Sequence, residues 1–222
     1  MTERLPATIP IFPLPDVVFY PRTALPLHIF ESRYRQMVAE ALEGDRILGI
    51  VMLKSGWEED YFGSPLTYDV GCAGRIEDVV TLPDGRFTLR LDGLWKIEIV
   101  RYLRLEPYRL AEVRSLEERE PDPEGESVED DKVRLLAAYT SVLAATAGRP
   151  ATAFTLDASL EYTRLVNLAC MHLGFEVEEK QRLLELHDVA ERGRRITTML
   201  EREWDRLLQQ HRLQDGGEES VH

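Results

Sequence analysis

The sequence predicts an α+β protein built in two parts, a β-rich first half with one inserted helix and a helical second half. Residues 87–91 and 95–99 alternate apolar and polar side chains, which is typical of half-buried strands. From residue 133 onward, apolar side chains recur at intervals of three and four, the spacing of an amphipathic helix. Residues 116–131 separate the two patterns with nine acidic side chains and two prolines, which predicts a linker.

The first strands are predicted from short apolar segments. Residues 9–14 favour an extended backbone, and Pro10 and Pro13 lack N–H donors, so we expect this segment at an edge of the sheet. Residues 24–29 predict a second strand. Residues 47–53 are continuously apolar, so we expect a strand that is buried on both faces.

One helix is inserted between these strands. It follows Glu31, whose carboxylate suits the positive end of a helix dipole, and Gly44 is placed to end it. Its apolar residues fall on a single stripe: Tyr34, Met37, Val38, Ala41 and Leu42.

The remaining β segments lie between residues 68 and 114. Residues 68–82 predict an extended segment, and 83–85 (PDG) predict a turn. Asp92 and Gly93 form a two-residue hairpin signal between the two alternating segments. Residues 108–114 predict the strand that closes the β region.

The second half predicts four helices. They cover 133–146, 158–173 with Asp157 as N-cap, 177–187, and a last helix opened by Asp188. The predicted parts of the chain are a β domain over 1–115, the acidic linker over 116–131, a helical bundle over 132–212 and a disordered tail over 213–222.

The charge balance disfavours nucleic acid as a partner. The 222 residues include 27 basic and 40 acidic side chains, a net charge of −13, with most of the excess after residue 115. Such a surface repels phosphate backbones and anionic lipids. No signal peptide or membrane span is predicted, because the longest apolar run is only 47–53. We therefore expect a cytoplasmic protein in which Cys72 and Cys170 are buried free thiols.

No catalytic, cofactor-binding or metal-ligating residue is predicted. None of the four lysines follows a glycine, so the sequence holds no G-x-x-x-x-G-K-[ST] phosphate loop. The five histidines show no zinc spacing, and no nucleophile elbow occurs. His28 near Glu31 and Arg33 is a candidate polar pocket, and a purely structural hydrogen bond is the alternative. If these three side chains converged in a deep pocket, an enzyme would become the stronger hypothesis.

Aromatic side chains in predicted loops are candidate polypeptide-binding residues. Large aromatic side chains supply contact area with few rotatable bonds, which suits a site of low sequence specificity. The alternative is that they fold back over the end of the β domain as a lid. The candidates are Phe19, Tyr20, Trp57, Tyr61 and Phe62.

Several of these segments resemble the N-terminal, substrate-binding domain of Lon proteases, in the variant found in stand-alone Lon-domain proteins. The matching segments are 9–21 (IPIFPLPDVVFYP), 25–34 (LPLHIFESRY), 82–86 (LPDGR), 108–113 (YRLAEV) and 177–185 (VEEKQRLLE). The resemblance extends over about residues 9–208 and implies a PUA-like β pseudo-barrel followed by a C-terminal helical bundle.

The resemblance implies a non-catalytic module of protein quality control that acts without ATPase or protease domains. We expect it to bind unfolded or extended polypeptide segments, with a protease or chaperone system as a further partner. A PUA-like module for nucleic acid or a small ligand is the alternative. The oligomeric state stays open, with a weak dimer among the options.

Overall fold

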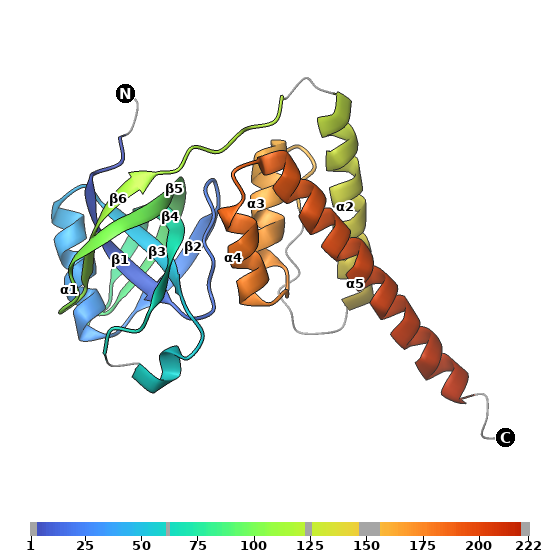
Figure 1. The fold of residues 1–222 in the computed structure, drawn as a ribbon. Coiled ribbons are helices and arrows are strands. Elements are labelled where there is room, and N and C mark those ends of the chain that lie inside the picture. The colour runs from blue at the N-terminus through green and yellow to red at the C-terminus, as the bar shows by residue number, and fades with distance from the viewer. Residues whose placement is uncertain (1–3, 61–62, 123–125, 147–155, 219–222) are drawn as a thin grey trace. The chain divides into compact units, whose positions relative to one another are not determined.

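The structure is a computed structural model that describes residues 4–60, 63–122, 126–146 and 156–218 (Figure 1). The chain divides into two compact units. The first combines Met1–Glu118 with Gly174–His187, and the second combines Arg119–Leu173 with Asp188–His222.

The first unit contains six strands, two α-helices and a short 3₁₀ helix. In chain order these are β1 (Thr8–Leu14), β2 (Ala24–Ile29), α1 (Ser32–Glu43), β3 (Ile47–Leu53), η1 (Trp57–Asp60), β4 (Thr67–Thr81), β5 (Phe87–Arg104), β6 (Arg109–Ser115) and α4 (Val177–Glu185). The second unit contains α2 (Glu126–Thr146), α3 (Tyr162–His172) and α5 (Val189–Glu218). The mixed α+β fold class is confirmed.

The six strands form one sheet in the order β2-β5-β4-β3-β1-β6. Strand β5 pairs with β2 over 87–92 and with β6 over 97–104, so β5, β4, β3, β1 and β6 close into a pseudo-barrel. Only β1 and β3 are parallel among the described pairings. Closure removes the free edges of five strands and leaves β2 attached to β5 alone.

The prediction that β1 is an edge strand is wrong, because β1 lies between β3 and β6. Pro10 lies where β1 pairs only with β6, and Pro13 lies where β1 pairs only with β3. The two ladders overlap at Ile11. Each proline therefore has one unpaired side toward which its missing N–H can point.

The hairpin predicted at Asp92 and Gly93 is also wrong, since β5 continues through both residues. The ladder between β4 and β5 shifts register at this point, and Gly93 bonds with Arg22 and Thr23 of the β1–β2 loop. A Cβ on Gly93 would lie 2.3 Å from the carbonyl oxygen of Tyr20. The glycine permits close approach of a loop rather than a reversal of the chain.

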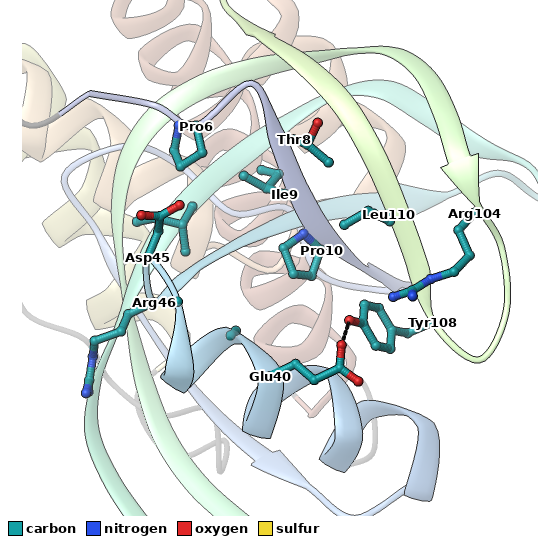
Figure 2. A pocket seen from close by; sticks show the side chains of 13 residues that line it. Pro6, Thr8, Ile9, Pro10, Glu40, Asp45, Arg46, Arg104, Tyr108 and Leu110 are labelled. Carbon is teal, nitrogen blue, oxygen red and sulfur yellow. Dashed lines mark hydrogen bonds between the residues drawn. The ribbon is translucent and has the colours of Figure 1, made fainter.

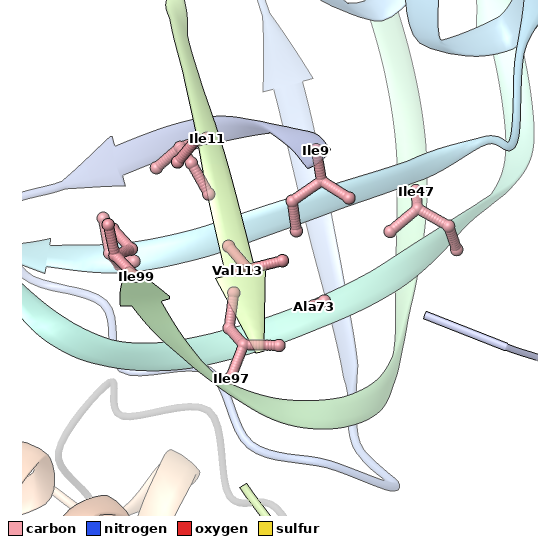
Figure 3. Packing of buried hydrophobic residues seen from close by; sticks show 9 residues of the cluster. Ile9, Ile11, Ile47, Ala73, Ile97, Ile99 and Val113 are labelled. Atoms are coloured by element: carbon pink, nitrogen blue, oxygen red, sulfur yellow. The ribbon is translucent and has the colours of Figure 1, made fainter. Parts of the chain in front are cut away.

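The core of the pseudo-barrel is made of inward-facing aliphatic side chains from five strands (Figure 3). The alternation seen along β5 places them there, because side chains of a strand point to opposite faces in turn. The buried cluster consists of Ile9, Ile11, Ile47, Val51, Ala73, Ile97, Ile99, Ala111 and Val113.

Helix α4 belongs to the first unit, whereas the sequence assigned it to the helical bundle. Gln181 Nε2 donates to the carbonyl oxygen of Val70 on β4 at 3.0 Å. The Nζ of Lys96 on β5 donates to the carbonyl oxygen of Leu186 at 2.7 Å, just after the helix. Lys96 is fully buried, so tertiary contacts override its position on the polar face predicted for this strand.

The second unit packs α2 and α3 against α5. Asp188 accepts a hydrogen bond from the backbone N–H of Glu191 at 3.1 Å, which confirms it as the N-cap of the last helix. Asp157 instead accepts from the N–H of Ser159 at 2.9 Å within a turn, and α3 begins later, at Tyr162.

Two predicted irregular segments contain helix. Helix α2 begins at Glu126, inside the predicted linker, and α5 continues to Glu218, inside the predicted disordered tail. Residues 219–222 of that tail lie outside the described residues. Within the described part of the chain, no helix combines the length and the apolar character needed to cross a membrane.

Candidate functional site

A cavity of about 240 Å³ opens on the first unit beside β1, β2, the start of α1 and the β5–β6 turn. We call it the apolar pocket. Its apolar lining includes Phe12, Pro13, Leu14, Pro15, Leu27, Phe30, Tyr34, Leu53, Pro65, Leu105 and Pro107. Its polar lining includes His28, Glu31, Arg33, Tyr108 and Arg109.

Aromatic packing shapes the inner wall of this pocket. Phe12 on β1 and Tyr34 on α1 are both buried, with ring centroids 4.3 Å apart. Phe30 and Leu105 lie on the lining yet remain 60% and 45% exposed. Exposed side chains of this size leave apolar area in contact with water, and a partner that covers them would recover that free energy.

The structure brings the predicted polar candidates His28, Glu31 and Arg33 to the lining of this pocket. Arg33 Nε donates to the Glu31 carboxylate at 3.0 Å, and the guanidinium lies 4.6 Å from the ring centroid of Tyr34. The Glu31 carboxylate is thus paired with Arg33, two residues further along the chain, rather than with His28.

The imidazole of His28 has different partners. Its Nδ1 lies 3.4 Å from Thr88 Oγ1 and its Nε2 lies 3.4 Å from an Nη of Arg86. A general acid–base pair needs a histidine oriented by a carboxylate or a comparable acceptor. Neither contact described for His28 is with a carboxylate.

Arg109 and Tyr108 complete the polar lining, and neither was a candidate from the sequence. Arg109 is 6% exposed and donates to the carbonyl oxygen of Pro65 at 2.7 Å. The hydroxyl of Tyr108 donates to the Glu40 carboxylate at 2.5 Å, which is the largest cause of a lowered pKa at Glu40. Burial raises the pKa of Tyr108 itself. Residues 108–113 belong to a segment that resembles the Lon family, but the sequence shows no sign that Tyr108 would bond Glu40 of α1.

Tyr108 also lines a second cavity of about 320 Å³, shown in Figure 2. Its floor includes Ile9, Pro10 and Leu110, and its polar side carries the hydrogen bond between Glu40 and Tyr108. Arg104 lies over the Tyr108 ring, with its guanidinium carbon 4.3 Å from the centroid. Glu40, Tyr108 and Arg104 thus contact one another on one side of the second cavity.

Two of the five aromatic candidates are core residues rather than surface ones. Phe19 is 1% exposed and Tyr20 is 0% exposed. The Tyr20 hydroxyl donates to the carbonyl oxygen of Lys180 at 2.5 Å. The β1–β2 loop that carries them packs against two other elements of the first unit. Its backbone bonds Gly93 of β5, and its Tyr20 bonds Lys180 of α4. These two side chains are therefore not exposed on the surface of the first unit.

Of the other aromatic candidates, only Trp57 is among the described residues. Trp57 begins η1 and is half-buried, and the described pocket lining does not include it. Tyr61 and Phe62 lie outside the described residues. Their neighbour Gly63 does line the apolar pocket.

Metal ligation finds no support in the described residues, which hold no group of three or more His, Cys, Asp or Glu able to bind an ion. Cys72 and Cys170 are buried free thiols, as predicted. The side chains that remain available at the apolar pocket can contribute apolar contact, hydrogen bonds and charge.

Comparison with known proteins gives the family. A family model described as the substrate-binding domain of ATP-dependent protease La (LON) matches residues 8–202. Lon protease 2 of Herpetosiphon aurantiacus is 31% identical over 215 residues, covering 96% of this chain and 26% of that protein. The Lon protease of Desulfosudis oleivorans is 27% identical over 207 residues, covering 90% and 24%. The chain thus spans about a quarter of the length of these relatives.

Two solved structures share the fold. A Lon N-terminal domain protein from Xanthomonas campestris has a TM-score of 0.60 at 20% identity, covering 86% of this chain and 97% of that one. The N-terminal domain of a Mycobacterium avium complex Lon protease has a TM-score of 0.62 at 17% identity, covering 87% and 98%. With the family match over most of its length, this chain belongs to the LON substrate-binding domain family.

Proposed function

We propose that this chain binds unfolded or extended polypeptide segments without catalysis, and that the apolar pocket is the binding site. One observation carries the proposal: an apolar-lined cavity whose rim residues Phe30 and Leu105 stay exposed in a domain of a substrate-binding family. The sequence had assigned this role to loop aromatics, of which Phe19 and Tyr20 are buried.

The size of the pocket favours a side-chain anchor over a whole small ligand. Sites for drug-sized ligands typically enclose about 300–1,000 Å³. The apolar pocket encloses about 240 Å³, which suits one or two apolar side chains of a longer chain. At the apolar pocket, the small-ligand alternative is therefore less well supported than polypeptide binding.

The expected affinity is weak. Burying one large apolar side chain contributes about 1.5–3 kcal/mol, and association costs about 4–15 kcal/mol in lost freedom. One or two anchored side chains therefore leave at most a small net free energy. Weak binding suits a domain that must accept many sequences and release them.

The test is a titration of a fluorescently labelled, permanently unfolded polypeptide with the protein and three variants. Phe30→Ala and Leu105→Ala should each weaken binding by about threefold to tenfold, since each removes part of a buried apolar contact of about 1 kcal/mol. Val133→Ala is the matched control, because Val133 is an equally exposed apolar residue, 58%, in α2 of the second unit. Trp57→Ala tests the remaining described aromatic candidate. Unchanged affinity in both pocket variants would remove the apolar pocket from the site.

The proposal extends to partners and compartment. Polypeptides bound here would be passed to a protease or chaperone system, consistent with Lon proteases among the relatives. Two free cysteines suit a reducing compartment such as the cytoplasm. Nucleic-acid binding is the alternative, and it predicts an affinity that falls steeply with salt for an oligonucleotide probe.

A further inference from the structure

Basic side chains gather at one end of the apolar pocket. His28 and Arg33 line it directly, and Arg86 lies 3.4 Å from the His28 ring. Arg35 packs against the same turn, since a Cβ on Gly85 would lie 2.3 Å from one of its Nη atoms. We call His28, Arg33, Arg35 and Arg86 the basic rim. It joins β2, the first turn of α1 and the β4–β5 turn.

The carboxylates described near the basic rim do not balance it. Glu31 pairs with Arg33 at 3.0 Å and Asp84 pairs with Arg86 at 2.7 Å. Arg35 has no ion pair among the described residues. Three arginines and a histidine thus accompany two carboxylates at the basic rim, which is a local positive excess in a chain of net charge −13.

Acidic side chains flank other parts of the pocket. Asp16 and Glu106 are exposed next to Pro15 and Pro107, which line other parts of the pocket. The basic rim lies where β2 meets α1, and Arg109 lines the pocket separately, from β6.

We infer that the apolar pocket selects polypeptide segments in which Asp or Glu side chains flank the apolar anchor, and that the basic rim makes this selection. The inference rests on the proposed function and adds the class of segment that is preferred. An extended chain advances about 3.3 Å per residue, so the first one to three residues beyond the anchor reach the rim.

The chemistry of the rim permits this contact although two of its arginines are already paired. A guanidinium carries five N–H donors, so an arginine that donates to one carboxylate can also donate to a second. Each exposed ion pair changes affinity by no more than about fivefold, and two or three together give about tenfold. The effect is local, because charges more than about 8–10 Å apart are screened at physiological salt.

The experiment compares three labelled peptides that share one apolar anchor and carry Glu, Gln or Lys at the three flanking positions. We expect the Glu peptide to bind about tenfold more tightly than the Lys peptide, with the Gln peptide between them. At 0.5 M NaCl the difference should shrink to less than twofold, while the Gln peptide binds as before.

Charge-reversal variants test whether the basic rim causes the preference for acidic peptides. Arg35→Glu and Arg86→Glu should each remove most of the difference between Glu and Lys peptides and leave the Gln peptide unchanged. Arg202→Glu is the matched control, because Arg202 is an exposed arginine on α5 and the change in net charge is the same. The control should keep the order of the three peptides.

The outcomes separate this inference from the proposed function. Equal binding of the three peptides, with loss in Phe30→Ala, would overturn the acidic preference and keep the pocket as the site. A preference abolished equally by Arg202→Glu would overturn the assignment to the basic rim. Competition by a single-stranded oligonucleotide more effective than the Glu peptide would assign the rim to phosphate instead. Absence of binding by all three peptides would overturn the proposed function itself.

Discussion

Replacing Gly193 by alanine tests how closely α3 and α5 pack in the second unit. A Cβ at this position would lie 2.0 Å from the hydroxyl oxygen of Tyr162, 2.8 Å from its Cζ and 3.0 Å from Cγ2 of Val166. Distances this short force the helices apart or displace the Tyr162 ring, which is only 5% exposed. Gly193 and Tyr162 therefore form a close contact that a methyl group cannot enter.

Two opposing effects set the magnitude. An alanine in a helix interior is favoured over glycine by about 1 kcal/mol. Overpacking of a tight contact costs about 1–3 kcal/mol, and loss of a buried aromatic ring costs about 3–5 kcal/mol. We expect Gly193→Ala to lower the free energy of unfolding by about 2 kcal/mol, which lowers the melting temperature by about 4–8 °C for a chain of this size.

Tyr162 supplies a second variant for the same contact. Its hydroxyl is buried without a hydrogen-bond partner among the described residues, and burial raises its pKa strongly. An unsatisfied buried hydroxyl costs about 1–3 kcal/mol, so Tyr162→Phe should stabilise the protein by about 1 kcal/mol. It also removes the atom nearest to the new Cβ, so the double variant should recover part of the loss at Gly193.

The assay is thermal and urea unfolding followed by circular dichroism. Gly174→Ala is the control, since a Cβ at Gly174 would meet no atom within 4 Å. The packing argument is refuted if Gly193→Ala is as stable as the parent protein, or if Tyr162→Phe fails to relieve its effect.

Two further predictions concern single contacts. Lys96→Ala should destabilise the first unit by about 1–3 kcal/mol in urea unfolding, because it removes the buried ammonium that donates to the carbonyl oxygen of Leu186, whereas exposed Lys54→Ala should have little effect. Asp188→Asn should cost up to about 1 kcal/mol at pH 7, since the amide oxygen can still cap α5 but the charge that pairs with Arg119 is lost. The hydrogen bond from Arg119 lowers the Asp188 pKa below its ordinary value of 3.8, so this stabilisation is present above about pH 4 and lost as the pH falls below it. Unfolding measured from pH 7 to pH 2 should show the two proteins converging, and a constant difference would contradict the assignment.

Sequence patterns were sufficient where one element supplies its own signal. The strand predicted at 47–53 is β3, and the apolar stripe that begins at Tyr34 is the buried face of α1. Gly44 ends that helix as predicted, and the turn at Gly85 adopts a positive φ of 79°. These features depend on the spacing of apolar side chains and on the backbone freedom of glycine. Both can be recognised from a few consecutive residues.

The candidate site was only partly predictable. His28, Glu31 and Arg33 were selected because they lie in one short segment, and they do line one pocket. Phe19 and Tyr20 were misjudged because a loop rich in proline looks exposed in sequence, while its burial depends on contacts with β5 and α4. Arg109 was missed because nothing near it in the chain indicates that its guanidinium bonds Pro65.

Local patterning and the family resemblance thus gave the fold class, most strand and helix positions and the family, because these follow from residues that are close in the chain. Folding in three dimensions decided that β1 lies inside the sheet, that α4 joins the β unit and that the exposed apolar rim belongs to Phe30 and Leu105. Each of those outcomes depends on which distant segments of the chain pack against one another and become buried. The order of residues along the chain does not show which segments those are.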